Sequence, residues 1–377
     1  MRALVIGAGP AGAAAALELA RGGARVTLAE KSAWPRIKTC GDGVSPPGVA
    51  IARDLGLALD DRFALPVGDI EAPSGARYRS GWRAETPWGT VIERRDLDAR
   101  LVDLAVAAGA RFTPATEVRG LVLDGRGARA ELARSGKPER FDAVVLAEGA
   151  TGALAAALGF PRYRSRLVAL RGYLRARRPL DAAFGLFFHR LLTPGYGWIF
   201  PLSPEVANVG ILVDARVAKR TNLRALLMRW LAASDVACDL FGEVPSLAGL
   251  SGGVIPTGRS RRVRGAVFLA GDAAGTADPF TAEGISQAWG SGADAGRALA
   301  ATGGDVRAAA ARYRRDLRRF DRNEAEARRL RLGFGFVIDP LVARAAYRPA
   351  LAHHLAANGL FMKESLPSFL AGIVRTW

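Results

Sequence analysis

The chain has 377 residues, a length that suggests two or three domain-sized units or one elaborated fold. Half of the residues are hydrophobic, which supplies a sizeable core and excludes a disordered, collagen-like or disulfide-framework protein. The cysteines Cys40 and Cys238 lie far apart in the sequence and indicate a reducing compartment. With only three histidines, two of them adjacent, we expect no metal site.

The formal net charge of +17 is carried almost entirely by arginine. Such a charge is typical of a protein with an anionic partner, namely nucleic acid, an anionic membrane surface or a phosphorylated substrate. A compositional bias of the source genome explains it equally well. Because no nucleic-acid-binding signature accompanies the charge, we expect no nucleic acid partner.

The first thirty residues follow the pattern of a dinucleotide-binding unit. An apolar run at 2–6 predicts a buried strand, an Ala/Leu-rich helix follows to about Arg21, and 25–29 predict a second strand that closes on Glu30. The turn between strand and helix carries Gly7, Gly9 and Gly12. This spacing allows a tight turn and brings a pyrophosphate close to the helix N-terminus, while the acidic residue suits an adenosine ribose.

This apolar N-terminal stretch is interrupted by glycines and charges before it is long enough to span a membrane. We find no other candidate span and expect a cytoplasmic protein, with a peripheral position on the inner membrane face as an open alternative.

A second stretch selects FAD as the dinucleotide. Residues 264–270 predict a strand that ends at Gly271-Asp272, and a long helix opens near Gly284 and runs to about Ala300. An aspartate at this point can accept hydrogen bonds from ribityl hydroxyls, and the helix N-terminus can face the isoalloxazine edge that becomes negative on reduction. Two further segments, 95–101 and 144–149, complete the pattern of a flavoprotein of the p-hydroxybenzoate hydroxylase type.

Two other motifs narrow the family. Lys38-Thr39-Cys40-Gly41-Asp42-Gly43 follows the second strand, and Pro194-Gly195-Tyr196-Gly197-Trp198-Ile199-Phe200-Pro201 lies mid-chain, shortly before Val209-Gly210-Ile211. With these motifs the chain resembles the geranylgeranyl reductase family of FAD-dependent oxidoreductases, from residue 3 to about 300. Members of that family reduce carbon–carbon double bonds of isoprenoid chains. Three positions depart from the family pattern: Glu148 replaces an aspartate, Ala282 a frequent glycine and Thr193 a proline.

The resemblance and the glycine motif together imply the residues that contact FAD. They are Gly7, Gly9, Ala11, Gly12, Glu30, Lys31, Cys40, Gly41, Gly43, Arg95, Val118, Gly271, Asp272, Gly284 and Ile285. The electron donor to FAD stays open between NAD(P)H and a reduced carrier protein, because related flavoproteins bind NAD(P)H without a second glycine motif.

Reduction of an isolated alkene needs a proton at one carbon as a hydride reaches the other, so the transition state carries positive charge. Tyr196, Trp198 and Phe200 alternate as on a strand, and their π-faces could stabilise that charge while they and Pro201 line an apolar substrate pocket. The alternative is that they are ordinary core aromatics. Cys40 either assists the proton side with Tyr196 and Trp198 or only lines the flavin site.

We predict an α/β protein, α+β overall, in three parts. A discontinuous Rossmann-like FAD-binding domain spans 1–59, 91–157 and 259–300, and an antiparallel-sheet substrate domain spans 60–90 and 158–258. A C-terminal helical region spans 301–377. Its first helix, from about 305, carries many arginines that we interpret as a solvated face, and the apolar residues 331–377 could cap the prenyl tunnel or enter a membrane interface.

We therefore predict an FAD-dependent reductase of carbon–carbon double bonds in a prenylated lipid, quinone or diphosphate. A flavin-dependent monooxygenase or halogenase of secondary metabolism is the nearest alternative, since residues 195–201 are similar to the halogenase motif Gly-Trp-x-Trp-x-Ile-Pro. Two differences from that motif, and no lysine between 39 and 136, count against it. A non-catalytic flavin electron carrier at a membrane surface is the third alternative.

Overall fold

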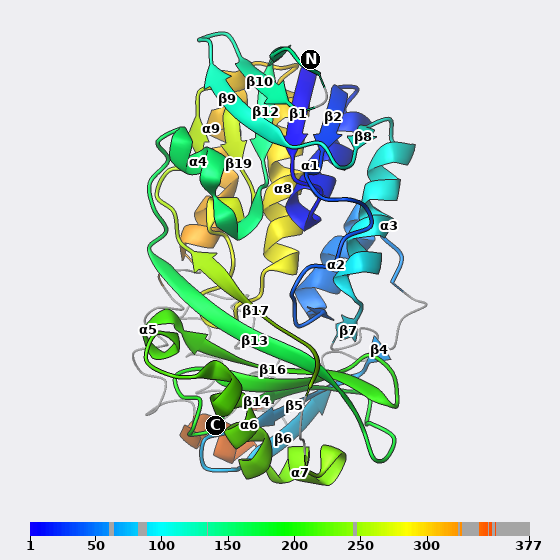
Figure 1. The fold of residues 1–377 in the computed structure, drawn as a ribbon, viewed down its shortest axis with the longest axis vertical. Helices are drawn as coiled ribbons and strands as arrows, with labels where there is room; N and C mark the ends of the chain where they lie inside the picture. Colours follow the sequence, from blue (N-terminus) through cyan, green and yellow to red (C-terminus); the bar gives the residue numbers. More distant parts are fainter. Residues whose placement is uncertain are drawn as a thin grey trace.

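A computed structural model shows two large sheets, one above the other along the long axis of the molecule (Figure 1). It describes residues 1–59, 64–81, 89–133, 135–243 and 247–322, together with 325, 339–345, 347–348 and 351. The predicted boundaries of the three parts stay a prediction. The two large sheets are nevertheless built from stretches that alternate along the chain, in the order in which the predicted FAD-binding and substrate segments alternate.

The upper sheet has six strands in the order β18-β19-β12-β1-β2-β8. The strands are β1 Arg2–Ile6, β2 Arg25–Ala29, β8 Arg111–Thr113, β12 Ala143–Leu146, β18 Val263–Arg264 and β19 Val267–Leu269. All neighbours run parallel except β18 and β19. Because β1, β2 and β12 are buried on both faces, they read in the sequence as almost unbroken apolar runs.

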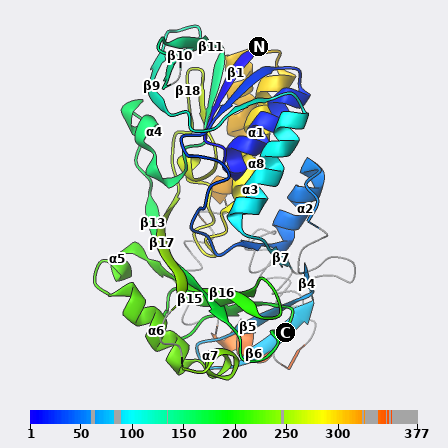
Figure 2. The ribbon, with the colours of Figure 1, turned by 45° about the vertical axis from the view of Figure 1, so that its right-hand side comes forward.

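Helices cover one face of this sheet and a small sheet covers the other (Figure 2). The helices are α1 Pro10–Arg21, α2 Pro46–Leu55, α3 Arg94–Ala107, α8 Ile285–Ala301 and α9 Val306–Asp316. The small sheet comprises β9 Val118–Leu123, β10 Ala128–Leu132 and β11 Glu139–Phe141. Alternate residues of β1 serve the two layers, since Ala3 and Val5 join the helical core while Leu4 and Ile6 join the core beneath β9 and β10.

The lower sheet has seven strands in the order β17-β13-β16-β15-β14-β5-β6. The strands are β5 Val67–Glu71, β6 Arg77–Gly81, β13 Ser165–Arg175, β14 Ala183–Phe187, β15 Tyr196–Pro201, β16 Val206–Asp214 and β17 Ala248–Thr257. The sheet is antiparallel, as predicted, except that β5 and β14 pair in parallel. That pair joins two distant segments of the chain, so no hairpin imposes antiparallel pairing there.

Three helices cover the outer face of the lower sheet: α5 Ala215–Ala218, α6 Leu223–Ala233 and α7 Asp235–Phe241. Short elements complete the fold. The strands β3 Gly43–Val44, β7 Gly89–Val91 and β4 Ala64–Leu65 form a small sheet, and the short helices are α4 Ala153–Ala157, η1 Gly149–Thr151 and η2 Gly271–Ala274. No helix among the described residues has both the length and the apolar character that a membrane crossing requires.

Beyond α9, the described residues between 339 and 351 pack against the lower sheet. Leu341, Val342, Ala345 and Leu351 are buried in one hydrophobic cluster with Trp198 and Phe200. The backbone N–H of Ser74, next to β5, donates to Asp339 Oδ1 at 2.8 Å. The other residues of 331–377 named for the cap prediction, such as Phe334 and Trp377, lie outside the described residues.

Candidate flavin and substrate site

The glycine turn after β1 fits the close approach of a phosphate. Gly7 adopts φ 97°, a left-handed conformation that favours glycine, and a side chain on Gly12 would overlap the carbonyl oxygen of Gly7. The Arg36 guanidinium borders the space in front of the turn, because a Cβ atom added to Gly9 would lie 3.2 Å from one of its nitrogens. A diphosphate in front of the turn would therefore meet the N-terminus of α1 and a cationic side chain, both of which suit its negative charge.

Glu30 lies at the end of β2 and is 5% exposed. Its carboxylate accepts from the backbone N–H groups of Ala8 and Ser32, both at 3.0 Å, and pairs with Arg36. Burial raises the pKa of Glu30, but these hydrogen bonds and Arg36 outweigh it and lower the pKa below its usual value. A carboxylate held ionised at this position can accept ribose hydroxyls.

Basic side chains surround the turn from the following segment and from α3. Arg94 is buried and forms two hydrogen bonds with Asp98, at 2.9 and 2.8 Å, and Arg36 pairs with the same carboxylate at 3.0 Å. Lys38 Nζ stands 3.3 Å from where a Cβ on Gly149 would lie. Burial lowers the pKa of Lys38, and Asp272 opposes the shift. This set of cations can neutralise a diphosphate in a partly desolvated space.

The loop after β19 completes the flavin side of the site. Gly271 adopts φ 61°, and its position packs against Ala11 of α1, where a Cβ would lie 2.8 Å from the Ala11 Cβ. Asp272 follows, and burial raises the pKa of its carboxyl while Lys38 and Arg94 oppose the shift. Gly284 immediately precedes α8, so the N-terminus of that helix opens toward this region.

The three predicted aromatic residues lie on one face of β15, as their alternation predicts. The ring centroids of Tyr196 and Trp198 are 6.3 Å apart, and those of Trp198 and Phe200 are 6.1 Å apart. We call these three rings the aromatic wall. Two rings from the β14 region extend the wall. The ring centroid of Phe184 lies 3.9 Å from that of Phe200, and the ring centroid of Phe188 lies 5.6 Å from that of Tyr196.

The aromatic wall contacts two loops that are predicted to hold the flavin. A Cβ on Gly41 would lie 3.4 Å from the Trp198 indole, and one on Gly43 would lie 3.0 Å from the Phe200 ring. At the other end, the Tyr196 hydroxyl donates to the carbonyl of Thr281, in the loop that precedes α8. The wall therefore joins the segment 38–43, which we call the cysteine loop, to the start of α8.

Cys40 lies in the cysteine loop and is only partly accessible. Burial raises the pKa of its thiol, with Arg94 opposing the shift. The raised pKa keeps the thiol protonated at neutral pH, so Cys40 can donate a proton rather than act as a thiolate.

The structure also places the remaining predicted residues. Lys31 and Arg95 are exposed, and Pro201 lines an outer cavity of about 540 Å³ together with Phe187 and Ile199, on the sheet face away from the aromatic wall. The alternation that groups residues 196, 198 and 200 places residue 201 on the opposite face. Val118 is buried at the start of β9, in a cluster with Ile6 and Ala29, and Ile285 is buried at the start of α8.

Two departures from the family pattern have visible structural consequences. Ala282 adopts φ 57°, a conformation in which glycine is favoured and alanine is strained. Glu148 accepts from the backbone N–H groups of Leu154 and Ala155 at 2.9 and 2.8 Å, so its longer side chain caps the N-terminal turn of α4.

Three residues of the site, Arg94, Lys38 and Asn208, were not among the predicted site residues. The i,i+4 spacing of Arg94 and Asp98 on an expected helix was an available signal for the first. The position of Lys38 depends on a loop without a regular period. Asn208 lies in the middle of an apolar strand, where a polar residue signals a buried partner.

The chain is similar to a known family and to several named reductases. The family described as FAD binding domain matches residues 1–171. The menaquinone reductase of Mycolicibacterium smegmatis is 32% identical over 305 residues, covering 75% of this chain and 72% of that protein. The chain belongs to the geranylgeranyl reductase family of FAD-dependent oxidoreductases. Within it, digeranylgeranylglycerophospholipid reductase 3 of Methanosphaera stadtmanae is 27% identical over 312 residues, covering 79% of this chain and 76% of that protein.

Solved structures extend the likeness of fold across the chain. A geranylgeranyl bacteriochlorophyll reductase-like protein from Thermoplasma acidophilum superposes with a TM-score of 0.82 at 21% identity, covering 100% of this chain and 96% of that one. The flavin-dependent brominase Bmp2 reaches a TM-score of 0.80 at 19% identity, covering 100% and 99%. At these identities the likeness shows the fold alone, which halogenases and reductases share.

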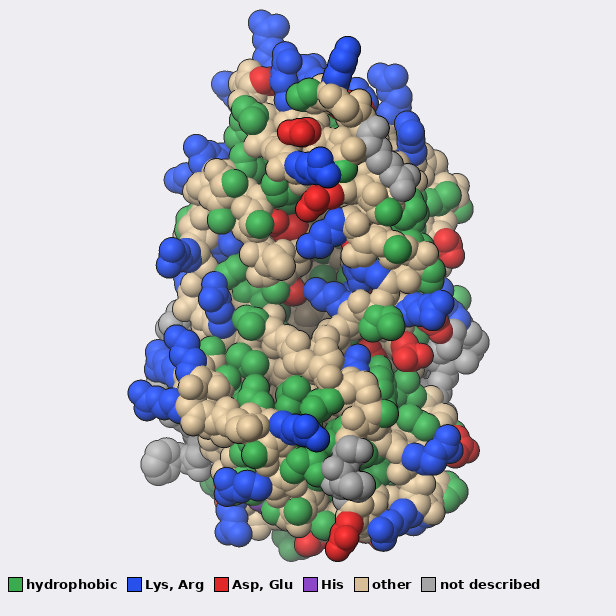
Figure 3. Space-filling view, in the orientation of Figure 1, with side chains coloured by type: hydrophobic (Ala, Val, Ile, Leu, Met, Phe, Trp, Pro, Cys, Tyr) green, Lys and Arg blue, Asp and Glu red, His purple; other side chains and the backbone are tan. Residues whose placement is uncertain are grey.

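The residues of this oxidoreductase fit FAD. The close-packed glycine turn, the ionised Glu30 and the cations beside Gly9 and Gly149 suit its adenosine and diphosphate parts. Figure 3 shows a hollow between the upper and lower halves of the molecule, with basic and acidic side chains at its margin. The cradle is therefore chemically suited to FAD.

Proposed function

We propose that this enzyme hydrogenates carbon–carbon double bonds in the isoprenoid chain of a prenylated quinone or lipid. The observation that carries the proposal is the aromatic wall, which spans from the cysteine loop to the start of α8 and is built from apolar rings. The similar proteins named menaquinone reductase and digeranylgeranylglycerophospholipid reductase support a prenyl chain as the substrate.

Reduced FAD, when bound, supplies the hydride for this reaction. The protein residues must then bind the chain, exclude water and deliver a proton to the second carbon. Tyr196 and Trp198 offer π-faces that stabilise positive charge on the alkene, and the buried neighbours of the wall keep the site dry. Cys40 holds its proton at neutral pH and lies in the loop against Trp198, which suits a proton donor.

The C-terminal segment supports an enclosed chain site. Leu341, Val342 and Ala345 share the hydrophobic cluster of Trp198 and Phe200, so residues far beyond the FAD-binding segments contribute to the same apolar space. A long hydrocarbon needs such a lining, because each CH₂ group moved out of water contributes about 0.8 kcal/mol. We propose that this segment closes the end of the prenyl site.

An anaerobic single-turnover experiment tests the function. Dithionite-reduced enzyme is mixed with menaquinone or with digeranylgeranylglycerophospholipid, and the flavin absorbance and the mass of the extracted lipid are followed. The expected result is flavin reoxidation with a mass gain of two that persists after the extracted lipid is exposed to air, because air returns a quinol ring to the quinone and leaves a saturated prenyl chain unchanged. Reoxidation that begins only when O₂ is admitted with a halide salt present, and that gives an oxygenated or halogenated product, would establish the monooxygenase or halogenase alternative. The absence of any product would leave an electron carrier.

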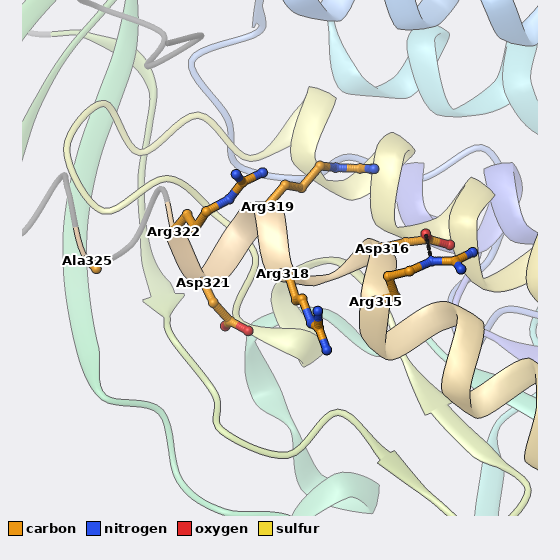
Figure 4. Close-up of a pocket in the computed structure, with 7 residues that line it drawn as sticks. All are labelled: Arg315, Asp316, Arg318, Arg319, Asp321, Arg322 and Ala325. Atoms are coloured by element: carbon orange, nitrogen blue, oxygen red, sulfur yellow. Dashed lines mark ion pairs between the residues drawn. The ribbon is translucent and has the colours of Figure 1, made fainter. Parts of the chain in front are cut away.

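The C-terminal end of α9 and the segment after it suggest how the enzyme meets a lipid. An open cavity of about 660 Å³ is lined there by Arg315, Asp316, Arg318, Arg319, Asp321, Arg322 and Ala325 (Figure 4). Arg319 pairs with Asp294, and Asp321 pairs with Arg262 at 2.6 Å. Arg318 and Arg322 are exposed and form no ion pair with a described acidic residue. We propose that these two arginines contact anionic lipid headgroups at a membrane surface.

Flotation with liposomes tests this contact. Vesicles that contain about one third anionic lipid should carry the wild-type protein upward, and the double substitution Arg318→Glu with Arg322→Glu should abolish flotation. The matched control is Arg126→Glu with Arg129→Glu, which makes the same charge change on the β9–β10 side. Absence of wild-type flotation with anionic vesicles would refute the membrane contact, and equal loss in both double variants would show only a net-charge effect.

A further inference from the structure

The side chain of Asn208 joins the aromatic wall to the cysteine loop. Asn208 lies on β16 and is fully buried, with 0% exposure. Its Oδ1 accepts a hydrogen bond from Trp198 Nε1 at 2.9 Å. Its Nδ2 donates to the carbonyl of Cys40 at 3.0 Å and to Asp42 Oδ2 at 2.8 Å. The amide uses both of its donors and its acceptor on these three contacts.

The adjacent strand supplies a second connection to the same loop. Tyr173 of β13 stands directly opposite Asn208 in the sheet, and its hydroxyl donates to Asp42 Oδ2 at 2.7 Å. Arg171, two residues earlier, donates to the Cys40 carbonyl at 3.1 Å and to the Gly249 carbonyl at 2.7 Å. Strands of the lower sheet therefore hold the cysteine loop, which belongs in sequence to the FAD-binding half.

The loop has a conformation that depends on such external contacts. Asp42 adopts φ 61°, a left-handed conformation that is uncommon for a non-glycine residue. Its carboxyl is 1% exposed, and burial raises its pKa, with the Tyr173 and Asn208 hydrogen bonds opposing the shift. Without these donors no hydrogen bonds would offset the cost of removing the Asp42 carboxylate from water, and we would expect the loop to rearrange.

The orientation of the Trp198 ring also depends on residues of β16. A side chain on Gly210, two residues after Asn208 on β16, would overlap the Trp198 ring. Gly210 thus makes room for the indole and Asn208 fixes its Nε1, so the ring has one orientation against the cysteine loop. An apolar residue at 208 could fill the volume but could make none of the three hydrogen bonds.

We infer that Asn208 is a positioning residue, one that sets Cys40 relative to the substrate-facing ring of Trp198 through simultaneous hydrogen bonds to both. The inference rests on the proposed function for its catalytic consequence. A displacement of about 1 Å of a proton donor lowers turnover far more than it lowers binding of a long apolar chain. Loss of Asn208 should therefore act on kcat more than on KM.

The test uses the full-length, FAD-loaded protein with Cys238→Ser as the background, so that Cys40 is the one remaining thiol. The variants are Asn208→Asp, which keeps an acceptor for Trp198 but sets a second carboxylate against Asp42, and Asn208→Leu, which removes all three bonds. Asn222→Asp is the matched control, because Asn222 caps α6 through an acceptor oxygen that aspartate also provides.

Two measurements follow each variant, both normalised to bound FAD. Cys40 alkylation by iodoacetamide should become roughly tenfold faster or more in both Asn208 variants and stay at the parent rate in Asn222→Asp. With a prenyl substrate, kcat should fall by about tenfold or more while KM changes by less than about threefold. FAD-loaded Asn208 variants that keep both the parent alkylation rate and the parent kcat would overturn the inference.

A milder variant decides the matter if the Asn208 variants do not fold. Tyr173→Phe removes one donor to Asp42 and leaves Asn208 in place, so it should raise the alkylation rate severalfold with a smaller loss of kcat. An unchanged alkylation rate in this variant would then overturn the inference. Alkylation needs no substrate, so a parent enzyme that reduces no prenyl chain would refute the proposed function and still leave the positioning of Cys40 measurable.

Discussion

The Tyr196 hydroxyl donates to the backbone carbonyl of Thr281, which fastens the first ring of the aromatic wall to the loop that opens α8. The ring is partly exposed, whereas Trp198 and Phe200 are 4% and 7% exposed. Burial raises the pKa of the Tyr196 phenol, with Asp278 and Glu283 adding to the shift, so the phenol stays protonated and keeps donating.

Removal of that hydroxyl should loosen the α8 loop without emptying the site. Tyr196→Phe keeps the ring and leaves the Thr281 carbonyl without this donor, a loss of about 1 kcal/mol. We expect kcat with a prenyl substrate to fall roughly fivefold and FAD binding to change little. Stopped-flow absorbance of flavin reoxidation measures the first and FAD titration the second. An unchanged kcat would show that the hydrogen bond is dispensable for turnover.

Substitution of Cys40 separates its two interpretations. If the thiol donates the proton, Cys40→Ala should lower kcat by about a hundredfold or more, and Cys40→Ser, which keeps a hydroxyl donor, should lose less. Cys238→Ser is the control, because Cys238 is an exposed residue of α7. Full activity of Cys40→Ala, measured by product mass per turnover, would mean that the cysteine only lines the flavin site.

Glu30 should govern FAD affinity more than turnover. Glu30→Gln removes the charge that accepts from the backbone N–H groups of Ala8 and Ser32 and that we predict accepts from the ribose. A charge-assisted hydrogen bond contributes about 1.5 to 3 kcal/mol, so FAD should bind roughly ten- to a hundredfold more weakly. Fluorescence titration of FAD into apoprotein measures this. Exposed Glu117→Gln should leave the affinity unchanged.

The packing of α1 against α8 predicts a sharp difference between two glycines. A Cβ on Gly292 of α8 would overlap the Ala11 carbonyl, whereas one on Gly253 of β17 would meet no atom within 4 Å. Gly292→Ala should therefore cost about 1 to 3 kcal/mol of unfolding free energy and weaken FAD binding. Gly253→Ala should be neutral or slightly stabilising. Thermal melts of both variants, with and without FAD, compare them directly, and equal melting temperatures would contradict the helix contact.

The carboxyl of Glu71 on β5 makes stability depend on pH. Burial raises its pKa to about 7, with Arg77 opposing the shift and Asp69 adding to it. The folded state therefore binds this proton more tightly than the unfolded state, whose value is 4.5. The resulting stabilisation is complete below pH 4.5 and disappears as the pH rises through about 7.

Glu71→Gln removes this titration. Relative to the variant, the wild type should lose about 2 kcal/mol of unfolding free energy between pH 5 and 8, after allowance for partial solvent screening. Denaturant unfolding at the two pH values measures the difference. A wild-type and variant pair with parallel pH profiles would show that Glu71 has an ordinary pKa in the folded protein.

Local patterns in the sequence determined the nucleotide-binding half. The run 2–6, the glycine turn and the strand ending at Glu30 each follow from short-range rules of strand burial, turn geometry and helix start, and the structure places β1, α1 and β2 within these bounds. The shared face of Tyr196, Trp198 and Phe200 follows equally from the two-residue repeat of a strand.

Only the tertiary structure decided which distant side chains meet. Helix α3 buries Arg94 beside the glycine turn and exposes Arg95, the residue predicted from the sequence, and spacing alone could not tell the two apart because packing sets the rotation of a helix. Asn208 and Cys40 are 168 positions apart, and no local period relates them. Their contact exists because two sheets built from alternating segments of the chain enclose one loop, and such long-range register leaves no trace in a single sequence.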